Sequence, residues 1–254
     1  MIIYYNYFLI GMAVFSLIVY VSLHYVNAGY GIFADKKWGF AISNRWGWFV
    51  MEFSIFALML ALWWFSDRRS NLVTLIFLLI FELHYFQRAF IFPFLIKGNS
   101  TMPIGIIAMG IFFNILNAFM QGGWLFYVSP QSRYSLSWLY SPQFIVGVVL
   151  FLTGFFVNMH SDAVIRHLRP KGDTRHYFPQ KGLFKYVSSA NYFGELVEWI
   201  GFAVLTWSVS GALFAVWTFA NLAPRAAKIN KKYAQTFPEE YQKIKPKRII
   251  PFIY

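Results

Sequence analysis

The sequence predicts an all-α, polytopic integral membrane protein that crosses the bilayer with about seven helices. Of its 254 residues, 58% are hydrophobic and only 13% are charged, whereas a soluble domain is about half apolar and about a quarter charged. The apolar residues recur in stretches of about 20, the length that a helix needs to cross a bilayer. We therefore expect residues 1–254 to form a single membrane-embedded domain.

Turn-forming residues separate the predicted spans, for example at Lys97-Gly98-Asn99 and Ser141-Pro142. The last two spans are expected to form a tight pair joined near Ser210-Gly211. In chain order, the spans are predicted near residues 5–27, 46–66, 72–96, 102–128, 142–165, 191–208 and 211–232.

The basic residues predict the orientation of these spans. With the N-terminus outside, the inside loops and the C-terminal region carry 18 Lys and Arg, and the outside loops carry 3. The positive-inside rule favours this arrangement, with a cytoplasmic C-terminus. Cytoplasmic anchoring also explains the net charge of +12 better than nucleic-acid binding does, so we expect membrane lipids and no nucleic acid as partners.

Polar residues concentrate in the last third of the chain, in the segments 158–169 and 191–199. Charged and amide groups are costly at membrane depth, so they usually face a polar cavity or one another. The orientation places segment 158–169 at the cytoplasmic side. Together the two segments predict a site for a large anionic ligand.

Two helix ends carry the candidate anion-binding groups. Arg166 and Arg169 lie three residues apart on one helix face, and Arg225, Asn230 and Tyr233 lie at the end of the last span. Arginine holds a pyrophosphate with paired hydrogen bonds. Any one of these arginines alone is more simply explained as an anchor at the lipid headgroups. Their combination favours an anion site.

Acidic and amide side chains lie near these groups. Asn191, Glu195 and Glu198 share one helical face, and Asp162 follows His160 by two residues. A carboxylate accepts hydrogen bonds from ribose hydroxyls, and an amide can hold a nicotinamide carboxamide. The alternative for Glu198 is a structural salt bridge, for example with an arginine of the 166–190 loop.

Glu52 and Tyr85 form a second candidate group, because each lies within a long apolar helix. A tyrosine hydroxyl beside a carboxyl group can polarise a ketone oxygen, where negative charge develops during reduction. The protonated form of Glu52 is itself a hydrogen-bond donor.

Several other kinds of site are not expected. The chain has no cysteine, which excludes disulfides, thiol catalysis and thiolate metal sites. Its five histidines show no metal-binding spacing, so we expect no metal. The segment 29–34 matches a dinucleotide fingerprint, but it lies between membrane helices rather than after a strand.

The chain resembles the steroid 5-alpha-reductase family over nearly its whole length. The most specific matches in the second half are Asn158-x-His160-Ser161-Asp162, Arg166-x-x-Arg169, Pro179-Gln180-x-Gly182, Tyr186-Val-Ser188-x-Ala190-Asn191-x-x-Gly194-Glu195-x-x-Glu198-Trp199, Arg225-Ala226 and Ile249–Tyr254. The first half matches more loosely, through Gly29-Tyr-Gly31, Trp48-Phe49, Glu52, His84-Tyr85-Phe86, Arg88 and Asn117-x-x-x-Gln121-Gly122.

This resemblance implies NADPH-dependent reduction of the Δ4 double bond of a 3-oxo-Δ4 steroid to the 5α product. It implies that Glu52 and Tyr85 are catalytic and bind the 3-keto oxygen, while hydride passes to C5. Residues 1–140 would then mainly form the substrate pocket, including Trp48, Met51, Arg88, Asn117 and Gln121. Residues 141–254 would mainly bind NADPH, through Asn158, Asp162, Arg169, His176, Asn191, Glu195, Arg225, Asn230 and Tyr233.

Three positions depart from the family pattern. Met51 stands where a Gln often precedes the membrane Glu, and His176 replaces a Tyr of the polar loop. Ile229 and Asn230 stand where the family has a His near the end of the last span. The first change concerns a substrate contact and the third a cofactor contact, and none removes the Glu52–Tyr85 pair.

Three alternatives remain open on the sequence. The chain could reduce another lipid enone or enoyl substrate, act as an S-adenosylmethionine-dependent lipid methyltransferase, or bind lipid without catalysis. We expect a multi-pass protein of either the bacterial inner membrane or the endoplasmic reticulum.

Overall fold

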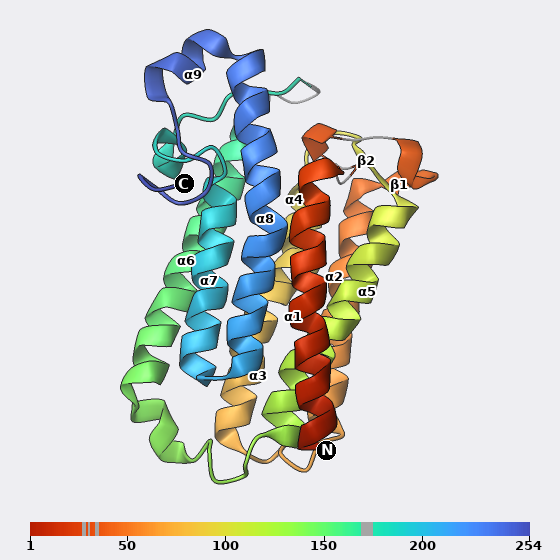
Figure 1. Ribbon diagram of the computed structural model, residues 1–254, viewed down its shortest axis with the longest axis vertical. Helices are drawn as coiled ribbons and strands as arrows, with labels where there is room; N and C mark the ends of the chain where they lie inside the picture. Colours follow the sequence, from red (N-terminus) through yellow and green to blue (C-terminus); the bar gives the residue numbers. More distant parts are fainter. Residues whose placement is uncertain (27–28, 30, 34–35, 169–174) are drawn as a thin grey trace.

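The computed structural model describes the chain except for residues 27–28, 30, 34–35 and 169–174, and it confirms the predicted all-α class (Figure 1). The helices are α1 (Ile2–Tyr25), α2 (Asn44–Trp64), α3 (Leu72–Phe86), α4 (Phe92–Leu95), α5 (Ile104–Gly122), α6 (Pro142–His167), α7 (Ala190–Thr206), α8 (Val209–Thr236) and α9 (Pro238–Ile244). A short antiparallel pair, β1 (Ala41–Ser43) and β2 (Thr101–Pro103), was not predicted.

Within the described residues, five helical stretches are long and apolar enough to cross a membrane: Ile2–Tyr25, Asn44–Trp64, Leu72–Leu95, Ile104–Val128 and Pro142–His167. They match the first five predicted spans. The third and fourth contain the π-helical segments Gln87–Ile91 and Gly123–Val128, a feature that often occurs at functional sites.

Helices α7 and α8 coincide with the sixth and seventh predicted spans but differ from the others. Helix α7 has 17 residues, which gives a length of about 25 Å at 1.5 Å per residue. Helix α8 has 28 residues, and its second half carries several basic side chains. The count of seven spans therefore stays a prediction.

Local interactions determine where several of the helices begin and end. The Asn71 side chain accepts hydrogen bonds from the backbone N–H groups of Val73 and Thr74, which caps α3. The turn between α7 and α8 lies at Trp207–Ser208, slightly before its predicted place. Trp207 adopts a left-handed conformation with φ 47°, and Ser208 Oγ accepts from the N–H of Gly211, so α8 starts earlier than Ser210.

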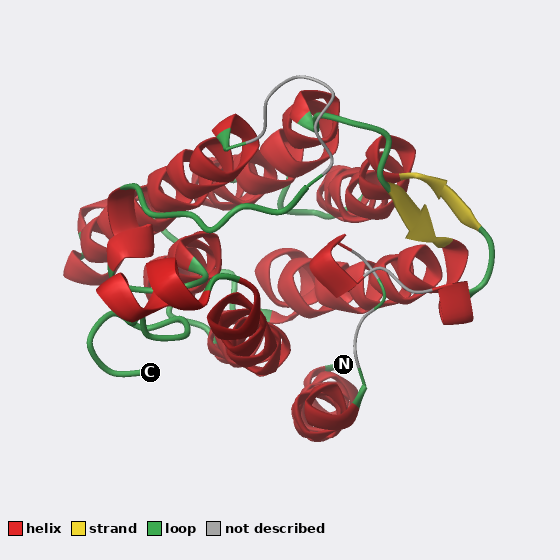
Figure 2. Ribbon diagram, turned by 90° about the horizontal axis from the view of Figure 1, so that it is seen from above, coloured by secondary structure: helices red, strands yellow, loops and turns green. Residues whose placement is uncertain are grey.

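The helices run side by side, and α7 packs between α6 and α8 (Figures 1 and 2). Helix α8 also packs against α1, and α2 packs against α5. The N-terminus lies at one end of the bundle, whereas α9, the C-terminus and the β1–β2 pair lie at the other (Figure 1). The chain therefore begins and ends at opposite ends of the bundle.

The most extensive contact between described helices joins α6 and α7, and glycines make it close. A Cβ at Gly154 would meet Glu198 Cα at 2.7 Å, and one at Gly194 would meet Asn158 Cα at 2.9 Å. Gly147, seven residues before Gly154 on α6, and Gly201, seven residues after Gly194 on α7, repeat this arrangement. Small residues allow membrane helices to approach backbone to backbone, and this approach brings the polar ends of α6 and α7 together.

Trp199 of α7 is the centre of the aromatic core and is 1% exposed. Its ring contacts Phe81 of α3, Phe151 of α6 and Phe214 of α8, with centroid distances of 5.5, 6.2 and 4.5 Å. One side chain thus joins three helices to α7, next in sequence to the polar residues at the start of that helix.

We expect Gly201→Val to destabilise the protein by about 1–3 kcal/mol, because the added side chain would force α6 and α7 apart. The new Cβ would lie 2.7 Å from Phe151 Cα and 2.8 Å from the Gly147 carbonyl oxygen. Thermal unfolding followed by circular dichroism in lipid nanodiscs measures the effect. Gly11→Val is the matched control, since nothing lies within 4 Å of a Cβ there. Equal melting temperatures for the two variants would contradict the role of this contact.

Candidate active site

The polar residues predicted on α6 and α7 meet in the structure. Asn191 Nδ2 donates to Asp162 Oδ1 at 3.1 Å, and Asn158 Nδ2 donates to the Asn191 backbone oxygen at 2.9 Å. Asn158 and Asp162 are buried, and Glu195 lies one turn after Asn191 on the same helix. Four residues predicted to bind the cofactor therefore form one group.

Arg88 joins this group to the first half of the chain. Its guanidinium forms an ion pair with Asp162, with Nη1 and Oδ2 3.3 Å apart, and it also acts electrostatically on Glu195. The guanidinium carbon lies 4.6 Å from the Trp48 ring centroid and 4.3 Å from that of Phe92, distances at which cation–π attraction operates. Arg88 was predicted on the substrate side, yet its carboxylate partner belongs to the predicted cofactor side.

Glu52 of α2 and Tyr85 of α3 are the predicted ketone-binding pair. Both are buried, and the Glu52 carboxyl group acts electrostatically on the Tyr85 hydroxyl. Arg88 and Glu195 are also close enough to act on Glu52. Asn117 Nδ2 donates to the Tyr85 hydroxyl oxygen at 3.3 Å, which leaves the hydroxyl hydrogen of Tyr85 free to be donated elsewhere.

Two amide side chains of α5 support this arrangement. Gln121 Nε2 lies 3.5 Å from Asn117 Oδ1 and 3.0 Å from the Ser210 backbone oxygen. Asn114 Nδ2 donates to the Met51 backbone oxygen at 2.8 Å, and it also interacts with the Glu52 carboxyl group. Met51 is buried against Gly110, so the residue that departs from the family pattern fills a gap between α2 and α5.

A pair that the sequence did not suggest links α3 to α7. His84 Nδ1 lies 2.9 Å from Glu198 Oε1, and Glu198 is 0% exposed. The salt bridge anticipated for Glu198 was with a loop arginine, whereas its partner is the histidine beside Tyr85. A histidine in an apolar helix is the signal that could have indicated this pair.

The other residues predicted to bind the cofactor lie toward the end of the bundle that holds the C-terminus. Arg225 Nε donates to the Tyr192 hydroxyl at 2.8 Å, and its guanidinium lies 5.6 Å from the Phe33 ring centroid. The Tyr233 ring packs against Phe178, and His176 is exposed. Arg169 lies outside the described residues.

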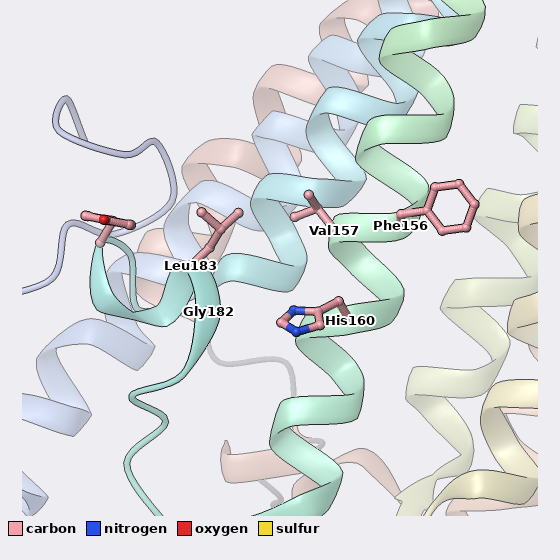
Figure 3. A pocket seen from close by; sticks show the side chains of 6 residues that line it. Phe156, Val157, His160, Gly182 and Leu183 are labelled. Carbon is pink, nitrogen blue, oxygen red and sulfur yellow. The ribbon is translucent and has the colours of Figure 1, made fainter.

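A shallow groove of about 320 Å³ lies elsewhere, between α6 and the turn Gly182–Lys185 (Figure 3). It is lined mainly by apolar side chains, and none of the predicted site residues belongs to its lining. Within the described part of the chain, no group of three or more histidine, aspartate or glutamate side chains is arranged to hold a metal ion. Because they bring the predicted site residues together in a buried place, the Arg88–Asp162 pair and the nearby Glu52 and Tyr85 form the candidate active site.

Comparison with known proteins identifies the family. The family model described as 3-oxo-5-alpha-steroid 4-dehydrogenase matches residues 100–254. The chain is 39% identical to 3-oxo-5-alpha-steroid 4-dehydrogenase 1 of Bos taurus, over 94% of this chain and 92% of that protein. It is 38% identical to the human protein of that name, over 93% and 90% of the two chains.

A plant relative is similar over an even larger share of its length. Steroid 5-alpha-reductase DET2 of Gossypium hirsutum is 34% identical to this chain, over 98% of this chain and 97% of that protein. The matches therefore cover both halves of the candidate site, including residues 1–99, which the family model leaves out. The chain belongs to the 3-oxo-5-alpha-steroid 4-dehydrogenase family and is an oxidoreductase that acts on CH–CH groups.

Proposed function

We propose that this protein uses NADPH to reduce the Δ4 double bond of a 3-oxo-Δ4 steroid to the 5α-3-oxo steroid. The printed names of its relatives support this substrate class. The observation that carries the proposal is the buried Arg88–Asp162 ion pair, because Arg88 follows Tyr85 by three residues and also acts electrostatically on Glu52. A cluster of this kind can place a ketone beside a nicotinamide.

The residues at the second half of the site fit NADPH in their chemistry. Asn158 and Asn191 offer amides for a carboxamide, and Asp162 and Glu195 offer carboxylates for hydroxyl groups. Arg225 offers a cationic side chain for phosphate, held in place by Tyr192. We assign His176, Tyr233 and Arg169 to the phosphate and adenosine end of the same cofactor.

The first half of the site would activate the ketone. NADPH supplies the hydride that reaches C5 of the steroid. The Tyr85 hydroxyl and the protonated Glu52 carboxyl group donate hydrogen bonds to the 3-keto oxygen, which takes up the displaced electron pair as the enolate forms. A proton then adds at C4 as the C3 carbonyl is restored. Preorganised donors of this kind each supply about 3–4 kcal/mol in other enzymes.

We further infer a seven-span topology with the N-terminus outside and the C-terminus in the cytoplasm. The chain begins and ends at opposite ends of the bundle, which requires an odd number of crossings (Figure 1). The end that holds the C-terminus also holds the basic half of α8. This arrangement supports the positive-inside assignment. A cytoplasmic opening would give the site access to cytoplasmic NADPH.

Purified protein in lipid nanodiscs should oxidise NADPH when testosterone is added and release a product two mass units heavier. Deuteride from labelled NADPH should appear at C5, and solvent deuterium at C4. The saturated 5α steroid is the control, because it lacks the enone. Turnover of other lipid enones but not of testosterone would show that the substrate is not a 3-oxo-Δ4 steroid. S-adenosylmethionine binding without NADPH oxidation would refute the proposal.

Tyr85→Phe should lower kcat about a hundredfold to a thousandfold, since it removes one donor to the developing oxyanion. The dissociation constant for NADPH should change little. Tyr140→Phe is the matched control, because Tyr140 is 81% exposed. Stopped-flow measurement of hydride transfer separates the chemical step from product release. Full turnover by Tyr85→Phe would show that another group polarises the ketone.

Arg225→Ala should raise the dissociation constant for NADPH about tenfold to a hundredfold, the effect of losing a hydrogen bond to a charged group. The rate of hydride transfer at saturating NADPH should stay near the wild-type value. Lys231→Ala is the matched control, because it removes one positive charge from an exposed position of the same helix. Quenching of protein fluorescence by NADPH measures both variants, and equal affinities would argue against a phosphate contact at Arg225.

A further inference from the structure

The residues Pro246–Ile250 run between the start of α7 and the end of α8, and we name them the C-terminal clasp. On the α7 side, the clasp pairs with the chain that leads into the helix. Lys247 N donates to the Tyr186 carbonyl at 2.8 Å, and Ser188 N donates to the Lys247 carbonyl at 2.8 Å. Ser188 Oγ adds a bond to the Arg248 carbonyl at 3.1 Å.

On the α8 side, Asn230 holds the clasp. Its Nδ2 donates to the Pro246 carbonyl at 2.9 Å and lies 3.4 Å from the Lys247 carbonyl. Its Oδ1 accepts from the Tyr241 hydroxyl at 2.9 Å. Both polar atoms of the Asn230 side chain are therefore engaged within the protein, although the sequence indicated a cofactor contact there.

Ile249 anchors the clasp between the two helices. It is 0% exposed and packs with Leu222 and Ala226 of α8, where Tyr192 and Phe193 of α7 also make contact. Tyr192 is the residue whose hydroxyl accepts from Arg225. The clasp thus contacts both helices beside the Arg225–Tyr192 pair, which links α8 to the part of α7 that carries Asn191.

We propose that the C-terminal clasp sets the distance between the α7 and α8 halves of the cofactor site, and that Asn230 is a positioning residue rather than a cofactor ligand. This inference rests on the proposed NADPH function. Without the clasp, the start of α7 and the end of α8 would have to be ordered each time the cofactor binds. Preorganisation removes that cost and so raises affinity.

Tyr241→Phe tests the clasp most sharply, because it removes one hydroxyl from the Asn230 contact and leaves every proposed cofactor ligand in place. We expect it to weaken NADPH binding about threefold to tenfold, the range for one lost hydrogen bond. Ser188→Ala, on the other side of the clasp, should act in the same direction. Testosterone binding and the rate of hydride transfer at saturating NADPH should stay at wild-type values for both variants.

A double-mutant cycle of Asn230→Ala and Tyr241→Phe distinguishes positioning from direct binding. If Asn230 acts through the clasp, the two changes should be strongly non-additive in NADPH affinity. If Asn230 instead contacts NADPH itself, Asn230→Ala should weaken binding while Ser188→Ala, which loosens the clasp without touching Asn230, should have no effect. Tyr140→Phe serves as the matched control for a lost tyrosine hydroxyl at an exposed site.

The outcomes separate the clasp from the proposed function. Wild-type protein that binds NADPH, together with unchanged affinity in Tyr241→Phe and Ser188→Ala, would overturn the clasp alone. Wild-type protein that does not bind NADPH would overturn the proposed function and the clasp with it. Circular dichroism spectra of the variants establish that any loss of affinity occurs in folded protein.

Discussion

The close contact between α6 and α7 is the constraint on which the site depends. Gly147, Gly154, Gly194 and Gly201 let the two backbones approach without intervening side chains. Lipid offers no hydrophobic force to drive two membrane helices together, so packing of this kind has to hold them. The contact ends in the polar turns of both helices, and the Asn158, Asp162 and Asn191 bonds are formed there because the helices are already close.

Ionisable groups at membrane depth are costly unless they have partners, and two buried pairs in the described structure supply such partners. Arg88, in the π-helical segment after α3, faces Asp162 of α6, and His84 of α3 faces Glu198 of α7. Removing one partner of a buried pair leaves an uncompensated charge, which costs about 3–5 kcal/mol. The pairs therefore fix α3 against α6 and α7 while holding Tyr85 between them.

Aromatic packing and polar pairing reinforce each other around Tyr85. Trp199 contacts both Tyr85 and His84, with ring centroids 5.8 and 4.7 Å apart. The π-helical segment after α3 places Arg88 over Trp48, so that its charge is turned toward Asp162. The proposed ketone-binding pair thus lies in a buried environment with aromatic neighbours, where oriented hydrogen-bond donors act most strongly.

The sequence by itself determined the membrane class, five helical stretches that can cross a bilayer, and the family, because apolar length and dense local motifs are properties of contiguous residues. It also indicated Glu52 and Tyr85 as a candidate pair, both from their place in long apolar helices and from the family resemblance. Hydropathy does not encode the rotation and register of one helix against another. For that reason the tertiary structure alone decided that Glu198 pairs with His84, 114 residues away, and Asp162 with Arg88, 74 residues away. The same reason explains why the hydrogen bonds of Asn230 to the C-terminal clasp could not be predicted from the sequence.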